Sequence, residues 1–148
     1  MYKKSIKTFI LLVLVSIIIS CDLVHTDLTL SSSDIKFIYD GDTITIKCIA
    51  DINCKKNALK VRIKGVDTPE IKGKCHKETL LARKAKQYTV AFVRTSGDII
   101  LSYDKYDMYD RYGRLLAYLS VDGRDLSRSL IKNNLGRQYE GGKRRGWC

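Results

Sequence analysis

Two segments of this chain alternate apolar and polar residues with period two, and a longer segment after them repeats its apolar residues with the period of a helix. Residues 43–48 read Thr-Ile-Thr-Ile-Lys-Cys, and residues 59–64 read Leu-Lys-Val-Arg-Ile-Lys. Such alternation predicts strands with one buried face. Within residues 77–94 apolar side chains recur at i, i+4, i+7 and i+11, counted from Leu81, which predicts an amphipathic helix. The fold must combine half-buried strands with this helix.

The remaining elements complete an α+β pattern. Residues 35–39, 99–103 and 115–121 are further strand candidates, and Asp125 is placed to cap a second helix that Gly136 can end. The resulting order is strand, strand, strand, helix, strand, strand, helix. It predicts a five-stranded barrel of the oligonucleotide/oligosaccharide-binding (OB) type with two or three helices.

Length and charge narrow the class of protein. The 148 residues are enough for one domain, and 45% hydrophobic residues with a single proline exclude a disordered chain. The formal net charge is +11, and +8 remains if the three lysines among the first seven residues are removed. A polyanionic partner is expected, nucleic acid first and an anionic membrane surface second.

The first twenty residues are typical of an export signal. Three lysines precede an apolar run over residues 9–19 that is too short to span a bilayer comfortably. Residues 18–21, Ile-Ile-Ser-Cys, resemble the lipobox of bacterial lipoproteins. The resemblance implies cleavage after residue 20 and attachment of lipid to Cys21. Ordinary signal cleavage and an uncleaved anchor are the alternatives.

The polar, serine-rich stretch over residues 21–33 predicts a tether, and the folded domain is expected over residues 34–148. The lipid would hold the protein at a membrane, whereas without lipid it would be secreted or periplasmic. We expect a monomer.

Four cysteines besides Cys21 remain: Cys48, Cys54, Cys75 and Cys148. An even number in an exported chain favours disulfides, with three connectivities possible. Cys48–Cys54 and Cys75–Cys148 are the pairs we expect. A zinc site is the alternative, although no C-x-x-C spacing supports it.

Three short motifs carry the chemistry. Residues 40–43 read Asp-Gly-Asp-Thr, residues 62–70 read Arg-Ile-Lys-Gly-Val-Asp-Thr-Pro-Glu, and residues 110–114 read Asp-Arg-Tyr-Gly-Arg. Carboxylate oxygens hold hard divalent cations, and guanidinium groups make forked bonds to phosphate. Each aspartate alone is a common turn former. The three motifs together point to phosphodiester hydrolysis.

In this order the motifs resemble those of the staphylococcal nuclease (thermonuclease) family, over roughly residues 35–139. The resemblance implies a Ca²⁺-dependent phosphodiesterase that acts on single- or double-stranded DNA and on RNA, leaving 3′-phosphate and 5′-hydroxyl ends. By position, Asp42 and Asp67 would be carboxylate ligands of calcium, and Thr68 would add its backbone carbonyl. Asp40 would support them.

The remaining implied roles concern the water and the phosphate. Glu70 would orient or deprotonate the attacking water, while Arg62 and Arg114 would contact the scissile phosphate. Further substrate contacts are expected from Tyr112, Tyr139 and, in the basic tail, Lys143, with Arg144, Arg145 and Trp147 as further candidates there.

Two other functions are open. One is a non-catalytic nucleic-acid-binding OB module on a membrane-anchored lipoprotein, and the other is an adhesion or structural lipoprotein. The full set of acidic and arginine positions favours the nuclease.

Overall fold

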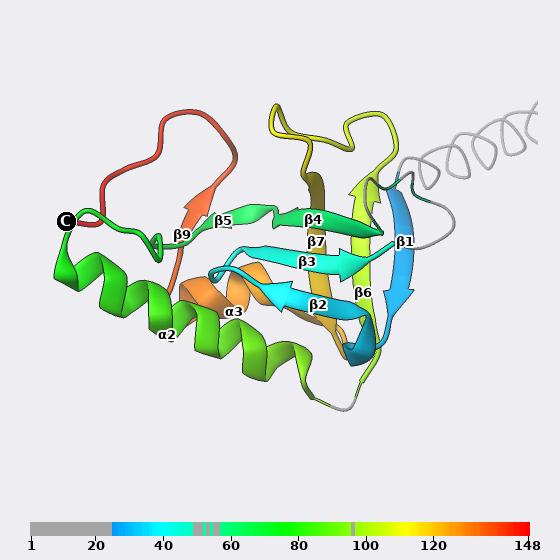
Figure 1. Ribbon diagram of the computed structural model, residues 1–148, viewed down its shortest axis with the longest axis horizontal. Coiled ribbons are helices and arrows are strands. Elements are labelled where there is room, and N and C mark those ends of the chain that lie inside the picture. Colours follow the sequence, from blue (N-terminus) through cyan, green and yellow to red (C-terminus); the bar gives the residue numbers. More distant parts are fainter. Residues whose placement is uncertain (1–24, 49–51, 53, 55–56, 96) are drawn as a thin grey trace, which may run out of the picture.

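The computed structural model describes residues 25–48, 52, 54, 57–95 and 97–148 (Figure 1). The elements follow the chain in the order β1 (His25–Leu30), η1 (Ser32–Asp34), β2 (Ile35–Ile38), β3 (Thr43–Lys47), β4 (Ala58–Ile63), β5 (Gly65–Asp67), α2 (His76–Val93), β6 (Ile99–Asp104), β7 (Leu115–Val121), β8 (Arg124–Asp125), α3 (Leu126–Lys132) and β9 (Arg137–Tyr139).

The main sheet has the strand order β1-β6-β7-β4-β3-β2, with β8 paired to β7. The β4–β7 pair is parallel and the other pairs are antiparallel. Laid flat, five interstrand steps of about 4.8 Å would separate the outer strands by about 24 Å. Yet β1 and β2 are joined by η1 alone, and the five steps from Leu30 to Ile35 span at most about 18 Å. The sheet therefore curls back on itself.

The expected α+β class and OB-type arrangement are confirmed. The five strands read from the sequence are β2, β3, β4, β6 and β7, and α2 crosses between β4 and β6 as the periodicity predicts. The buried face of α2 differs slightly from the predicted one. Ala85 and Phe92 are buried as predicted, but Ala82 and Thr89 are buried in place of the neighbouring predicted positions. Figure 1 shows α2 running along one side of the sheet.

The N-terminal boundary differs from the expectation. Residues 25–30, placed in the tether by the sequence analysis, form β1 and pair with β6 along the whole strand. Burial alternates along the strand, and Leu30 at its end lies in the core. The segment therefore forms a strand although its composition is polar. The signal segment and Cys21 lie outside the described residues. Among the described residues, no helix has the length and hydropathy needed to cross a membrane.

The C-terminal segment also departs from expectation. Helix α3 begins at the predicted cap, where the side chain of Asp125 accepts the N–H of Arg128, but it ends before Gly136. Gly136 instead lies where β9 approaches β5, and a Cβ there would meet the Val66 side chain at 2.4 Å. The glycine therefore serves the β5–β9 pair rather than the end of a helix.

Both expected disulfides are confirmed. Cys48 and Cys54 are bridged with Cα atoms 5.7 Å apart, and Cys75 and Cys148 with Cα atoms 6.1 Å apart. The second bridge fixes the end of the chain to the residue that caps α2. The tail after β9 is thereby held across the face of the molecule that carries the candidate site.

Candidate active site

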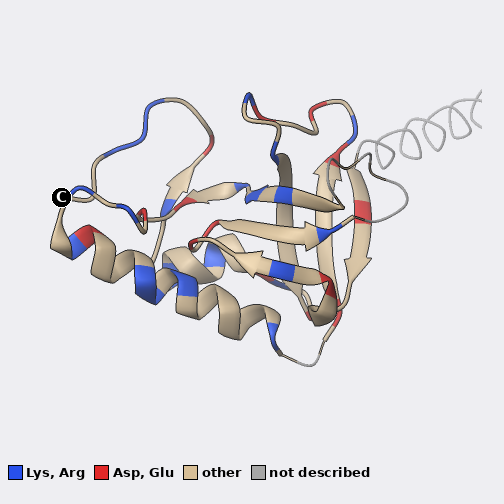
Figure 2. Cartoon of the chain, in the orientation of Figure 1, with Lys and Arg blue, Asp and Glu red and all other residues tan. Residues whose placement is uncertain are grey.

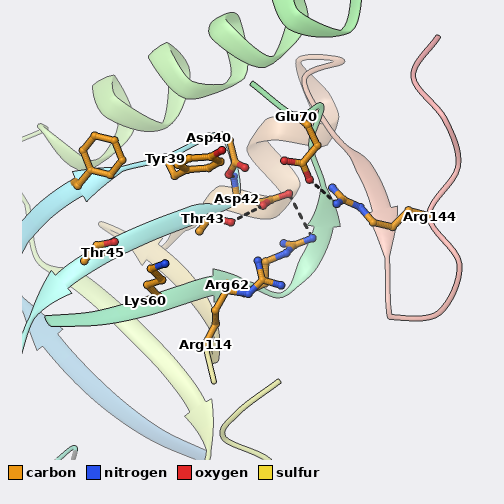
Figure 3. A pocket seen from close by; sticks show the side chains of 11 residues that line it. Tyr39, Asp40, Asp42, Thr43, Thr45, Lys60, Arg62, Glu70, Arg114 and Arg144 are labelled. Atoms are coloured by element: carbon orange, nitrogen blue, oxygen red, sulfur yellow. Dashed lines mark hydrogen bonds and ion pairs between the residues drawn. The ribbon is translucent and has the colours of Figure 1, made fainter. Parts of the chain in front are cut away.

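A pocket of about 350 Å³ opens beside strands β2, β3 and β4 (Figure 3). Six of the candidate site residues line it, and they come from different parts of the fold: Asp40, Asp42, Arg62, Glu70, Arg114 and Arg144. The β2–β3 turn, the middle of the chain around β4 and β5, and the start of β7 meet here because β4 pairs with both β3 and β7.

The β2–β3 turn is tied tightly to the turn that follows β5. One oxygen of Asp42 accepts the backbone N–H of Thr68 at 2.7 Å and its hydroxyl at 2.9 Å. Gly41 lies between Ala85 and Thr68, where a larger residue would not fit because its Cβ would be 2.8 Å from both. Thr89 of α2 donates its hydroxyl to the Gly41 carbonyl at 2.7 Å. Helix α2 and β5 thus fix the position of the Asp42 carboxylate.

Arg62 lies between the two predicted acidic ligands. Its Nη2 is 3.3 Å from Asp42 and 3.9 Å from Asp67, and all three side chains are nearly buried. The side chain is further fixed by a bond from Nη1 to the Ile63 carbonyl at 2.5 Å, and its guanidinium is 5.9 Å from the ring of Tyr139. A buried cation between two carboxylates offsets charges that would otherwise destabilise the fold.

Asp40 is a buried carboxyl that forms no ion pair with a described residue. Burial, together with the charges of Asp42 and Glu70, raises the pKa of Asp40 to about 7, although the N–H of Asp42 bonds to it. The acidic side of the pocket therefore holds more negative charge than Arg62 alone neutralises.

Arg114 reaches the pocket from a tight loop that precedes β7. Asp110 bonds both the backbone and the guanidinium of Arg114, with Nη2 and Oδ2 2.7 Å apart. Tyr112 stacks beside the same guanidinium at 5.5 Å from its ring centroid and is 69% exposed. The arginine is thus held in place by its own loop.

Arg144 of the C-terminal tail reaches the acidic side of the pocket. Its guanidinium bonds the carboxylate of Asp67, donates to Glu70 at 2.5 Å and donates to the backbone carbonyl of Thr68 at 3.2 Å. Burial disfavours its charge, but the bonds to Glu70 and Asp67 outweigh burial and raise the pKa of Arg144. Figure 3 shows the pair with Glu70 at the edge of the pocket.

Comparison with known protein families identifies the family of this chain. Residues 60–145, more than half of the chain, match the family described as staphylococcal nuclease homologue. The chain belongs to the staphylococcal nuclease family. The matched range contains all the site residues discussed above except those of the β2–β3 turn.

Two proteins named as endonucleases are similar to this chain over 98 residues. Endonuclease YncB of Bacillus subtilis (strain 168) is 38% identical, over 66% of this chain and 43% of that protein. The SPbeta prophage-derived endonuclease YokF of the same strain is 36% identical, over 66% of this chain and 31% of that protein. The aligned region thus spans less than half the length of either relative.

The donor set fits the hard metal ion on which the staphylococcal nuclease family depends. The oxygens of Asp67, the Thr68 carbonyl and Glu70 already share one cation, the guanidinium of Arg144, and Asp42 shares Arg62 with Asp67. A group of oxygens that surrounds a cation in this way, without sulfur or imidazole among them, is suited to a hard divalent cation.

The weaker predictions fall outside this cluster. Neither Lys143 nor Tyr112 lines the pocket; Lys143 is exposed, and Tyr112 contacts Arg114, which does line it. Tyr139 does approach the site, through Arg62. The contacts of Arg144 with the acidic residues were missed. Its only sequence signal was a basic tail that ends in a cysteine.

Proposed function

We propose that this protein is a metal-dependent endonuclease that hydrolyses phosphodiester bonds in DNA and RNA, with Ca²⁺ as the metal. The observation that carries the proposal is the position of Arg62, which lies between Asp42 and Asp67 in a pocket shared with Glu70 and Arg114. A pocket that brings carboxylates and guanidinium groups together suits one cation and one phosphate.

Asp42, Asp67 and the carbonyl of Thr68 would hold the ion. When bound, the ion neutralises phosphate charge and polarises the phosphoryl oxygen. The hydrogen bonds from Thr68 and Thr43 to Asp42 hold that carboxylate in a fixed orientation.

The hydrolytic step uses the other three side chains. Glu70, whose side chain is 40% exposed, takes a proton from a water that attacks phosphorus. The bond from the water oxygen to phosphorus forms and the bond to the 5′ oxygen breaks. The 5′ oxygen then takes a proton from solvent, and the phosphate stays on the 3′ oxygen. Arg62 and Arg114 stabilise the charge that builds on the equatorial oxygens.

The decisive experiment measures cleavage of end-labelled single-stranded DNA and RNA by the purified protein in calcium and in chelator. Glu70→Gln and Arg114→Ala should each lower the rate by about 10²-fold or more. Glu140→Gln is the matched control, because Glu140 is an exposed carboxylate outside the pocket. Mass spectrometry of the fragments should find 3′-phosphate and 5′-hydroxyl ends.

Two results would overturn the proposal. Equal cleavage rates in chelator and in calcium would show that the reaction does not depend on the metal. Tight binding of DNA with no cleavage under any divalent ion would favour a non-catalytic nucleic-acid-binding module.

We further propose that the protein is exported and anchored by lipid at Cys21. The lipobox-like residues 18–21 support this, as do two disulfides, which persist in oxidising compartments. Cys21→Ser should move the protein from the membrane fraction to the soluble fraction. Membrane association that survives this substitution would argue against the lipid.

A further inference from the structure

Two large aromatic side chains stand exposed beside the pocket. Phe37 is 53% exposed and Tyr39 is 41% exposed, whereas Ile38 between them is buried. Residues two apart in an extended segment share a face, so both rings point outward on the same side. Both also line the pocket.

Each ring begins a row of side chains that crosses three strands and ends in a cation. Phe37 lies opposite Thr45, and Thr45 lies opposite Lys60. The ring also has the ammonium of Lys86 4.8 Å from its centroid. Threonine is small, so this row leaves an aromatic face and a positive charge with little side-chain bulk between them.

The second row runs through the proposed catalytic centre. The N–H of Tyr39 bonds the carbonyl of Thr43, and Thr43 lies opposite Arg62. Two residues along a strand separate the rows by about 7 Å. The two rows thus repeat one arrangement, ring then threonine then cation, and the row of Tyr39 ends on a guanidinium that would grip the scissile phosphate.

We propose that Phe37 and Tyr39 form a stacking platform for two neighbouring unpaired bases of single-stranded nucleic acid. The inference deepens the proposed function by naming a substrate form. Stacking of bases on aromatic rings tolerates any sequence but needs bases released from a duplex. Lys60 and Arg62 supply the phosphate contacts on the other side of the threonines, so one strand can be held by its bases and its backbone together.

The test is binding in chelator, read by fluorescence anisotropy, so that cleavage does not enter. The probes are a single-stranded DNA of about 12 nucleotides, the same strand with abasic sites and its duplex. Phe37→Ala and Tyr39→Ala should each weaken single-strand binding by at least about fivefold and leave abasic binding within about twofold. Tyr39→Phe, which keeps the ring, should bind as wild type does.

Tyr106→Ala is the matched control, because Tyr106 is 87% exposed in the β6–β7 loop and does not line the pocket. Equal wild-type affinity for normal and abasic strands would overturn the platform, as would equal losses in the control variant. Loss of calcium-dependent cleavage with base-dependent binding intact would instead refute only the nuclease.

A second, independent observation concerns the tail that follows β9. Beyond Arg144, Trp147 donates its indole N–H to Asp67 at 3.3 Å, and Arg137 stacks on the indole with its guanidinium 3.7 Å from the ring centroid. Cys148 closes the segment through its bridge to Cys75. Figure 2 shows in blue the Lys and Arg positions along this tail.

We infer that Arg144 is a built-in competitor of the metal ion. Its guanidinium bonds Asp67, the Thr68 carbonyl and Glu70, so it uses two of the oxygens that would hold calcium and the proposed base. A guanidinium and a divalent cation cannot share these oxygens without strong repulsion. Binding of the ion therefore displaces Arg144, and the Cys75–Cys148 bridge strengthens the competition because it keeps the tail close. This inference rests on the proposed metal site.

The test titrates calcium itself into the protein by calorimetry. Arg144→Gln should raise calcium affinity at least about tenfold, whereas Arg145→Gln, which removes the same charge from an exposed neighbour, should change it less than about twofold. Reduction of the Cys75–Cys148 bridge in the wild-type protein should also raise the calcium affinity. This second measurement tests the inference even if the Arg144→Gln variant folds poorly.

Unchanged or weaker binding in Arg144→Gln would overturn the competition and would identify Arg144 as a support of the site. Calcium binding by none of the proteins would refute the proposed metal itself.

Discussion

Asp110 holds Arg114 by both its backbone and its side chain. One carboxylate oxygen accepts the backbone N–H of Arg114 at 2.9 Å, and the other accepts Nε at 2.7 Å. The turn between them is closed by bonds from Gly113 to Asp110 and from Asp110 to Arg114. Burial opposes ionisation, but these bonds lower the pKa of Asp110. The guanidinium is therefore positioned before any substrate arrives.

The first prediction follows from this pair. Asp110→Asn should lower the cleavage rate by about 5- to 20-fold, less than loss of Arg114 itself, because the arginine remains but loses its charged partner. Steady-state kinetics on labelled DNA measures the effect. Asp107→Asn, at an exposed aspartate of the same loop, should leave the rate unchanged. A loss as large in Asp107→Asn would show that the loop's net charge matters instead.

The second prediction concerns pH and stability in metal-free buffer. Because the pKa of Asp40 rises from 3.8 to about 7 on folding, the folded protein keeps a proton that the unfolded chain releases. The contribution of Asp40 to the free energy of unfolding is therefore greatest below pH 3.8 and is lost as the pH rises towards 7.

Asp40→Asn cannot titrate, so its stability relative to wild type should increase by at least about 1 kcal/mol between pH 4 and pH 8. Urea unfolding in chelator at several pH values measures the difference. Parallel pH profiles for the two proteins would show that Asp40 ionises normally.

The third prediction tests how close α2 lies to the β2–β3 turn. Gly41→Ala places a methyl group 2.8 Å from Ala85 and Thr68, so the turn must shift. We expect a loss of about 1–3 kcal/mol in stability, and a fall in cleavage larger than tenfold because Asp42 moves with the turn. Gly146→Ala, which meets nothing within 4 Å, is the control for both measurements.

The fourth prediction separates charge from shape at Arg62. Arg62→Lys keeps a cation between Asp42 and Asp67, so thermal unfolding should change little, whereas Arg62→Ala leaves two buried carboxylates and should cost about 3–5 kcal/mol. Both variants should cleave DNA slowly, because lysine lacks the forked guanidinium. Near-wild-type cleavage by the lysine variant would argue that Arg62 only balances charge.

Local patterns predicted the elements whose structure is decided locally. The alternation over residues 43–48 and 59–64 predicted β3 and β4, and the apolar repeat predicted α2 within one or two residues at each end. Asp125 was recognised as a cap because the hydrogen bond it makes spans only three residues. The motifs also predicted that Asp42, Arg62, Glu70 and Arg114 would lie close together, and these side chains line one pocket.

Contacts between distant residues could not be predicted in this way. β1 was read as a tether because its partner, β6, lies far along the chain and its own composition is polar. Arg144 lies 77 residues from Asp67, and their contact depends on the β5–β9 pair and on the terminal disulfide acting together. No local propensity encodes such a meeting.

The Cys75–Cys148 bridge also changes what a protease could do to this protein. It joins residues 73 apart, and the exposed loop around Tyr106 lies inside that span. A single cut in this loop would leave two fragments still covalently linked, with Asp42 and Asp67 on one and Arg114 on the other. Such a nicked molecule would keep its halves in register, so the site could outlast backbone damage for as long as the bridge stays oxidised.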